Sequence, residues 1–317
     1  MILYGMTDLS ALIVRHLPAP GIFDTLLDGI QLFRVDTPVP RVNAVYPPSI
    51  CAIVQGTKQA YLHGRSFVYE AGQALCVTMS IPIEAEVPTA TPQNPVLGLL
   101  VSLESRVAVE TIVACQAAPT STPPVARVTG ADNPSGLGVV RWDPAFSDAL
   151  RRILALLGHP EEARILGPGR VRELIYAAIQ GEAGALIRGH LSEGQEIAQI
   201  VGYVRDHLHE SISVDDLARR VGMSRAVFDR RFKAVTTYAP LQFIKAMRLN
   251  NAALLLRQGA TVSEAAYAVG YASASQFSRE FSRQFHMPPR AWGRSFKREV
   301  VQRPTVPFMS SPTSVTP

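Results

Sequence analysis

Two segments in the last third of the chain repeat each other with an offset of 48 residues, and this repeat restricts the possible folds more than any other feature. In each segment, apolar or small side chains recur at positions i, i+3, i+4 and i+7, and a glycine follows directly. That spacing puts them on one face of a short helix, and glycine readily takes the positive φ at which helices end. The residues are Val214, Leu217, Ala218, Val221 and Gly222 in the first copy, and Val262, Ala265, Ala266, Val269 and Gly270 in the second. Each copy therefore predicts a short helix that ends in a tight turn.

A second helix is expected after each turn, because a serine that can cap it follows: Ser224 in the first copy and Ser273 in the second. Both helices carry two phenylalanines four residues apart, Phe228 with Phe232 and Phe277 with Phe281, which should face inward. The outward positions are mostly polar or basic: Arg225, Ala226, Asp229, Arg230 and Lys233 in the first helix, and Ser275, Ser278, Arg279, Ser282 and Arg283 in the second. A helix, a glycine turn and a helix with a basic outer face form the helix-turn-helix pattern.

A pair of αα-hairpins in a helical bundle is the alternative, but two matched copies with Arg230 and Arg279 at equivalent positions favour DNA binding. Such a helix fits the major groove, about 12 Å wide, where arginine binds guanine bidentately. We expect Arg230 and Arg279 to read bases, and Lys233 and Arg283 to contact the DNA backbone. Residues 240–257 are predicted to form one helix between the copies. If it is unbroken, one monomer can read two major-groove faces, about 34 Å apart.

The charges of the chain are segregated along its length. Residues 1–194 hold 14 Lys and Arg against 17 Asp and Glu, a net charge of −3. Residues 224–298 hold 13 basic against 3 acidic side chains, a net charge of +10. Segregation this strong indicates a polyanionic partner for the C-terminal part.

The N-terminal part is predicted to be rich in β-structure. Short apolar runs at 50–54, 74–78 and 95–103, and a hairpin at 61–67 with Gly64 in its turn, are typical of a sandwich or small barrel. From Asp143, which can cap a helix, the period becomes helical, with further helices expected at about 170–180 and 182–190. The fold class is therefore α+β with two domains.

We expect a β-rich domain with flanking helices over residues 1–194, an all-α domain over 195–300, a loop at 119–124 and a disordered tail over 301–317. The apolar stripe at 146–157 suggests dimerisation through the helices at 143–180, although the same stripe equally fits the core of the domain.

The C-terminal part of the sequence resembles the AraC/XylS family of bacterial transcription regulators. The matching strings are DDLARRVGMS at 215–224, RFK at 231–233, PLQ at 240–242, AAYAVGY at 265–271 and SQFSREF at 275–281, followed by Pro288 and Pro289. The resemblance implies base contacts from Ala226, Asp229 and Arg230 in the first unit and from Ser275, Gln276 and Arg279 in the second. Asp229 either accepts from cytosine N4 or orients Arg230. The resemblance also implies promoter DNA and RNA polymerase as partners.

The N-terminal part resembles, less specifically, the cupin-like sensor domain of one AraC subgroup, through PPSI at 47–50, VQG at 54–56 and Gly72 with Gln73. This resemblance implies a domain that binds a small-molecule effector and dimerises. The residues do not identify that effector.

Other functions have less support in the sequence. A metal-dependent cupin enzyme needs several histidines and a carboxylate, yet His63 is the only histidine between residues 17 and 158. We therefore expect no catalytic residues, no metal and no cofactor, while architectural DNA binding without sequence preference remains an alternative. The three cysteines, Cys51, Cys76 and Cys115, suggest buried thiols rather than a disulfide framework, with a thiol that senses oxidants or electrophiles as the alternative. Without a long apolar run or a signal peptide, the expected location is cytoplasmic.

Overall fold

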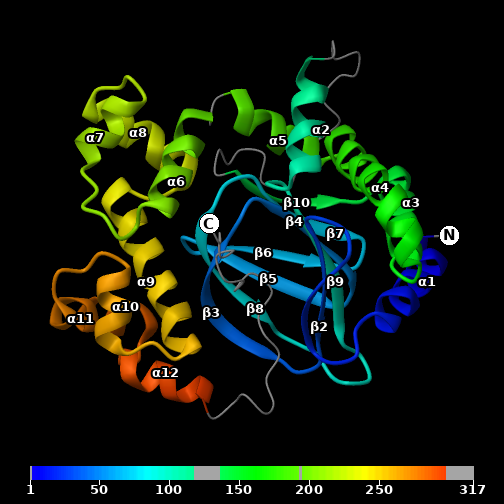
Figure 1. Cartoon of the computed structure of the whole chain (residues 1–317), viewed down its shortest axis with the longest axis horizontal. Coiled ribbons are helices and arrows are strands. Elements are labelled where there is room, and N and C mark those ends of the chain that lie inside the picture. Colours follow the sequence, from blue (N-terminus) through cyan, green and yellow to red (C-terminus); the bar gives the residue numbers. More distant parts are fainter. Residues whose placement is uncertain (1, 118–135, 193–194, 298–317) are drawn as a thin grey trace.

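The computed structural model describes residues 2–117, 136–192 and 195–297. It places a β-rich N-terminal part beside a helical C-terminal part (Figure 1). The loop predicted at 119–124 and the tail predicted at 301–317 lie outside the described residues. None of the described helices is long and apolar enough to cross a membrane.

The N-terminal part contains two antiparallel sheets that face each other. The larger sheet has the strand order β1-β2-β9-β4-β7-β10, and the smaller has the order β3-β8-β5-β6. The strands are β1 (Gly21–Asp24), β2 (Ile30–Val35), β3 (Val39–Tyr46), β4 (Ser49–Gln55), β5 (Thr57–Leu62), β6 (Arg65–Glu70), β7 (Gln73–Val77), β8 (Ile81–Val87), β9 (Val96–Ser102) and β10 (Leu137–Arg141). The predicted β-rich fold and each of the four predicted strand regions are confirmed.

The β5–β6 hairpin shows why sequence patterns succeed here. Lys58, Ala60 and Leu62 point into the sandwich, and the residues between them point outward, as the period of a strand requires. His63 and Gly64 form the turn with φ values of 48° and 78°, the double positive φ of a tight hairpin. The hairpin and its turn are thus where the sequence predicts them.

Five helices accompany the sheets: α1 (Ile2–Arg15), α2 (Arg106–Ala117), α3 (Pro144–Leu156), α4 (Pro160–Gln180) and α5 (Ala183–Ser192). The outer face of the larger sheet, with Ile50, Leu99 and Val101, shares a core with α1, α3 and α4. As predicted, Asp143 caps α3, because its carboxylate accepts a hydrogen bond of 2.7 Å from the amide of Phe146. Helices α1 and α2 were not predicted.

Helix α4 begins ten residues before the predicted start at about 170. It continues through Gly167, Pro168 and Gly169, a combination that in isolation indicates a break. Packing overrides this preference, since Gly167 is buried and a Cβ there would come within 2.4 Å of Leu27. Any larger residue at position 167 would therefore force the Leu27 side chain to shift where α4 crosses it.

The apolar stripe of α3 lies inside the domain. Phe146, Leu150, Ile153 and Leu154 are at most 5% exposed and pack in the same core as α4. The stripe is thus core, and it gives no support to a dimer.

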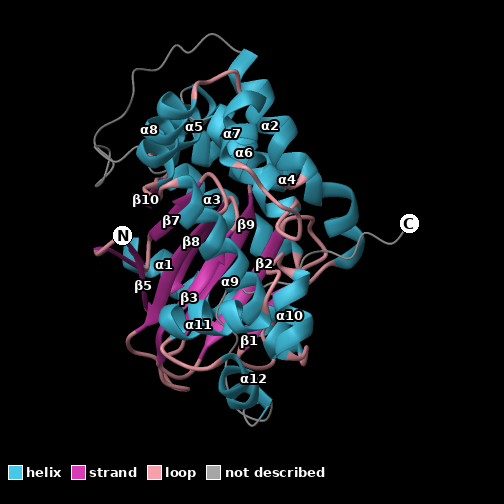
Figure 2. Cartoon of the chain, turned by 90° about the vertical axis from the view of Figure 1, so that its left-hand side faces the viewer, coloured by secondary structure: helices cyan, strands magenta, loops and turns pink. Residues whose placement is uncertain are grey.

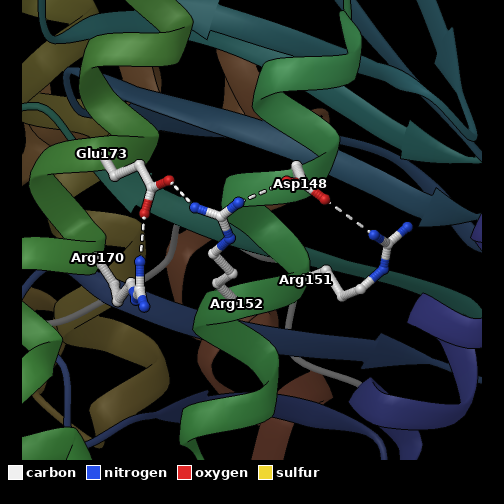
Figure 3. Close-up of polar contacts among 5 residues, drawn as sticks. All are labelled: Asp148, Arg151, Arg152, Arg170 and Glu173. Atoms are coloured by element: carbon white, nitrogen blue, oxygen red, sulfur yellow. Dashed lines mark hydrogen bonds and ion pairs between the residues drawn. The ribbon is translucent and has the colours of Figure 1, made fainter.

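The solvent side of the same helix pair carries a charged network (Figure 3). Asp148 accepts from Arg151 at 3.0 Å and from Arg152 at 2.7 Å, while Glu173 pairs with Arg152 and accepts from Arg170 at 2.9 Å. These exposed pairs join α3 to α4 across their outer surface.

Over residues 195–297 the structure describes seven helices: α6 (Gln195–Asp206), α7 (Val214–Arg220), α8 (Arg225–Thr236), α9 (Pro240–Gln258), α10 (Val262–Ala268), α11 (Ala274–Phe285) and α12 (Pro289–Lys297). Their apolar side chains form two separate clusters, which share only α9. Phe243 and Met247 of α9 belong to the first, and Leu249 and Leu256 belong to the second. The predicted single helix at 240–257 is confirmed.

Candidate nucleic-acid interface

Helices α7 and α8 form one helix-turn-helix unit, and α10 and α11 form another, at opposite ends of α9 (Figures 1 and 2). Gly222 and Gly270 take φ values of 65° and 82° in the two turns. A Cβ on Gly270 would also lie 2.5 Å from the carbonyl oxygen of Leu208. This turn therefore requires glycine both for its positive φ and for the close approach of the backbone. With 19 residues, α9 is about 28 Å long.

Buried phenylalanines hold each second helix against its unit. Phe228 and Phe232 are fully buried with ring centroids 5.3 Å apart, and Phe277 and Phe281 repeat the arrangement at 5.4 Å. The opposite face of each helix is consequently turned outward. Figure 2 shows α8 and α11 in separate parts of the molecule.

The predicted outward residues of α8 are on the surface. Arg225, Ala226, Arg230 and Lys233 are exposed, and Asp229 is half-buried. Ser224 occupies the N-cap position, but its hydroxyl makes no capping hydrogen bond. The first unit therefore presents the predicted side chains without the predicted cap.

Arg225 forms ion pairs with two aspartates, and these pairs were not predicted from the sequence. Its guanidinium lies 3.0 Å from a carboxylate oxygen of Asp229 and 3.1 Å from one of Asp215 on α7. These two hydrogen bonds raise the pKa of Arg225. In this structure Asp229 thus pairs with Arg225, and no ion pair joins it to Arg230 among the described residues. The four-residue spacing of Arg225 and Asp229 was the available signal.

The second recognition helix, α11, differs in its polar contacts. Ser273 caps it by accepting from the amide of Gln276 at 3.3 Å. Ser275, Gln276, Arg279 and Arg283 are exposed, whereas Ser278 is half-buried and donates to the carbonyl of its own helix at Ala274. Ser282 is also half-buried, so four of the six positions predicted on this helix are exposed.

Arg230 and Arg279 are both exposed, and neither forms an ion pair within the described part of the chain. By contrast, Arg231 pairs with Glu196 of α6 at 2.8 Å. The two equivalent arginines of the repeat therefore keep their donors available to a partner.

Glu280 connects α11 to α9 and to Tyr271 through polar contacts, and this role was not predicted from the sequence. Its side chain is 13% exposed and accepts from Tyr271 at 2.9 Å and Gln276 at 3.1 Å, and it pairs with Lys245 of α9 at 3.4 Å. Burial alone would raise the pKa of Glu280, but these hydrogen bonds and the Lys245 charge lower it. An acidic residue in a basic segment was the only signal in the sequence.

Family comparisons agree with this geometry. The family described as the AraC-type transcriptional regulator N-terminus matches residues 26–186, and a helix-turn-helix domain family matches residues 217–295. Because the first match alone spans just over half of the chain, the chain belongs to the AraC-type transcriptional regulators.

Two curated relatives have regulatory names. The HTH-type transcriptional activator RhaS of Salmonella paratyphi A is 24% identical over 153 residues, which are 47% of this chain and 55% of that protein. The HTH-type transcriptional regulator MtrA of Neisseria gonorrhoeae is 32% identical over 119 residues, 37% of this chain and 40% of the relative. The chain thus spans about half the length of the curated relatives it matches.

Solved structures of ToxT from Vibrio cholerae strain SCE256 share the fold. An apo form has a TM-score of 0.55 at 11% identity and covers 84% of this chain and 97% of its own. A form with a bound unsaturated fatty acid has a TM-score of 0.50, also at 11% identity, and covers 83% and 94%. At this identity the likeness shows the two-domain fold alone.

Proposed function

We propose that the chain is a transcription regulator that binds double-stranded promoter DNA sequence-specifically through α8 and α11. The observation that carries this proposal is the equivalence of Arg230 and Arg279, exposed at matching positions of two recognition helices. The rigid α9 sets the separation of these helices, and its length of about 28 Å is comparable to one turn of DNA.

The predicted side chains, of which Asp229 and Ser278 are half-buried and the rest exposed, divide into two roles. For base edges we assign Ala226, Asp229 and Arg230 on α8, and Ser275, Gln276 and Arg279 on α11. For the sugar-phosphate backbone we assign Arg225, Lys233, Ser278 and Arg283. Besides its proposed base contact, Asp229 holds Arg225 in position, because the two side chains form an ion pair of 3.0 Å.

Footprinting and competition binding test sequence specificity against architectural binding. Purified protein should protect a site near a promoter and should bind that site at least about 1000-fold more tightly than random DNA at physiological salt. Equal affinity for all duplexes would refute sequence-specific regulation, since it is the behaviour of an architectural protein. The salt concentration must be the same in the measurements on the promoter site and on random DNA, because phosphate contacts make the affinity depend on salt.

The sensor role belongs to the N-terminal part, for which we take residues 1–194, with residues 195–300 as the DNA-binding domain. The regulator acts by binding a small-molecule effector, not by catalysis, and it acts on RNA polymerase at the promoter. The family membership and the bound fatty acid of ToxT support an effector, although the likeness to ToxT extends to the fold only.

We also propose that the chain forms a homodimer through α4. Its outer surface exposes Ile165 by 69%, Leu166 by 45% and Tyr176 by 52%. By helix spacing Ile165 and Tyr176 lie on the same side of α4, and exposed apolar side chains on one side of a helix favour a protein partner. This side of α4 replaces the buried α3 stripe as the basis of the proposed dimer.

A further inference from the structure

A cleft of about 440 Å³ lies between the N-terminal sandwich and the DNA-binding helices. Asn43, Tyr61 and Glu84 form one wall, and Lys245 of α9 and Arg283 of α11 form part of the other. The first three alternate with buried residues along β3, β5 and β8, so they project from the outer face of the smaller sheet. The cleft therefore lies outside the sandwich, where α9 packs on the sheet.

The interior of the sandwich is occupied by large side chains. Phe33, Tyr46, Tyr69 and Lys58 are each fully buried in the space between the two sheets. The amine of Lys58 lies 3.8 Å from Cys51 Sγ and 5.0 Å from the centroid of the Phe33 ring. A ligand there would have to displace these residues, whereas the cleft is open. A volume of this size is typical of small-molecule sites.

The charges of the cleft favour an anionic group. Glu84 is paired with Arg41 on the same sheet, and Glu280 is paired with Lys245. Arg283 has no ion pair within the described part of the chain. The acidic side chains are thus neutralised by neighbours, and the guanidinium of Arg283 is left to attract a carboxylate.

Asn250 indicates, independently of the charges, that the ligand carries a hydrogen-bond donor. This α9 residue lines the cleft and is 6% exposed. Its amide nitrogen donates to the carbonyl of Ala246 at 2.8 Å, but its Oδ1 accepts no hydrogen bond from the described residues. This oxygen is itself closed off from the cleft, so a hydroxyl group of a ligand would reach it only after the Asn250 side chain turns toward the cleft, and the hydrogen bond would then offset the cost of the unpaired acceptor.

We infer that the cleft is the effector site and that its ligand is a small hydroxy acid. The carboxylate pairs with Arg283 beside Lys245, and hydroxyl groups donate to Asn250 and Glu84. This inference rests on the proposed function. It gives the effector a direct route to DNA binding, because Arg283 is carried by the second recognition helix.

Calorimetric titration of the full chain without DNA tests the site, with D-gluconate, L-tartrate and citrate as probes. Xylitol carries the hydroxyls without the charge, and succinate carries the charge without the hydroxyls. We expect at least one hydroxy acid to bind saturably at one molecule per chain, and at least about tenfold more tightly than xylitol or succinate. Binding should weaken at least about tenfold in Lys245→Gln and in Arg283→Gln, but not in Arg164→Gln, an exposed arginine of α4.

Three results would overturn the inference: no saturable binding of any of the three hydroxy acids, equal binding of xylitol or succinate, or unchanged affinity in both cleft variants. Promoter binding is measured separately on the same preparations. A protein that binds its promoter but no hydroxy acid refutes the ligand site alone. A protein that binds no promoter refutes the regulator proposal.

Discussion

The hydroxyl oxygen of Thr237 lies 2.7 Å from Nδ1 of His63, and this hydrogen bond joins the C-terminal end of α8 to the β5–β6 turn. Thr237 is the C-cap of the recognition helix, with a φ of 65°. Beside it, the Tyr238 ring meets the His63 ring edge-on at 4.1 Å, and its hydroxyl donates to the carbonyl of Pro82 at 2.9 Å. The C-terminal end of α8 is therefore attached to the smaller sheet of the N-terminal part.

His63→Ala should loosen this attachment without unfolding either part, because His63 is exposed in a turn. Loss of one hydrogen bond and one ring contact should speed amide exchange at the end of α8 by about twofold to tenfold. Hydrogen exchange with mass spectrometry would measure this, with Ser66→Ala in the same hairpin as the control. Equal protection of α8 in both variants would show that the contact contributes nothing.

Acid should weaken the same contact. Burial, and next to it the positive charge of Lys233, lower the pKa of His63 below its ordinary value of 6.5. The docked state thus favours neutral His63, so docking is strongest above pH 6.5 and weakens as the pH falls through the window below it. Exchange at the end of α8 should speed up in the wild type as the pH falls below 6.5, after correction for intrinsic rates. His63→Ala should lack this change, and an identical pH profile would contradict the assignment.

Arg230→Ala and Arg279→Ala should each cost about 1–3 kcal/mol of binding to the specific site and relax the preference at one base position. The reason is that a bidentate contact to guanine is lost while the positioning contacts remain. Binding to a library of single-base operator variants measures both effects, and Arg231→Ala, whose partner is Glu196, serves as a matched control. A uniform loss on every sequence would instead assign the arginine to phosphate.

Lys233→Ala and Arg283→Ala should weaken binding to all DNA sequences alike. Each removes about one phosphate contact, so the slope of log affinity against log salt should become shallower by about 0.9. Fluorescence anisotropy over a salt series measures the slope. A slope that stays at the wild-type value in Lys233→Ala would place this side chain away from the backbone.

Ile165→Glu and Tyr176→Glu should shift the protein from dimer to monomer, because a carboxylate replaces exposed apolar surface on α4. Sedimentation velocity at micromolar concentration measures the change, with Arg164→Glu as a control for added negative charge on the same helix. A wild-type protein that sediments only as a monomer would remove the dimer proposal.

The parts of the fold that depend on local periodicity were predictable. Both helix-turn-helix units follow from side chains four residues apart, such as Phe228 with Phe232, and the hairpin turn at Gly64 follows from the need for positive φ. Helix α4 was predicted ten residues too short, because the local signal of Pro168 opposed a packing arrangement that only the folded domain provides.

The candidate site was predictable as a set of exposed positions, but its pairings were not. Whether Asp229 pairs with Arg225 or with Arg230 depends on Asp215 across the turn, and sequence spacing does not place that residue. His63 looked like an isolated turn histidine, because its partner Thr237 is 174 residues away. The cleft exists only once α9 has packed on the sheet, so no local pattern indicates it.

In the binding mode proposed above, the unbroken α9 also sets which operators the chain can use. In a continuous helix, each added residue turns one end relative to the other by about 100° and advances it by about 1.5 Å. A single insertion in α9 would therefore turn α8 and α11 toward different sides of the duplex. A changed spacing between the two half-sites of the operator would be needed to compensate. The helical phase of the promoter is in this way coupled to the residue count of one protein helix.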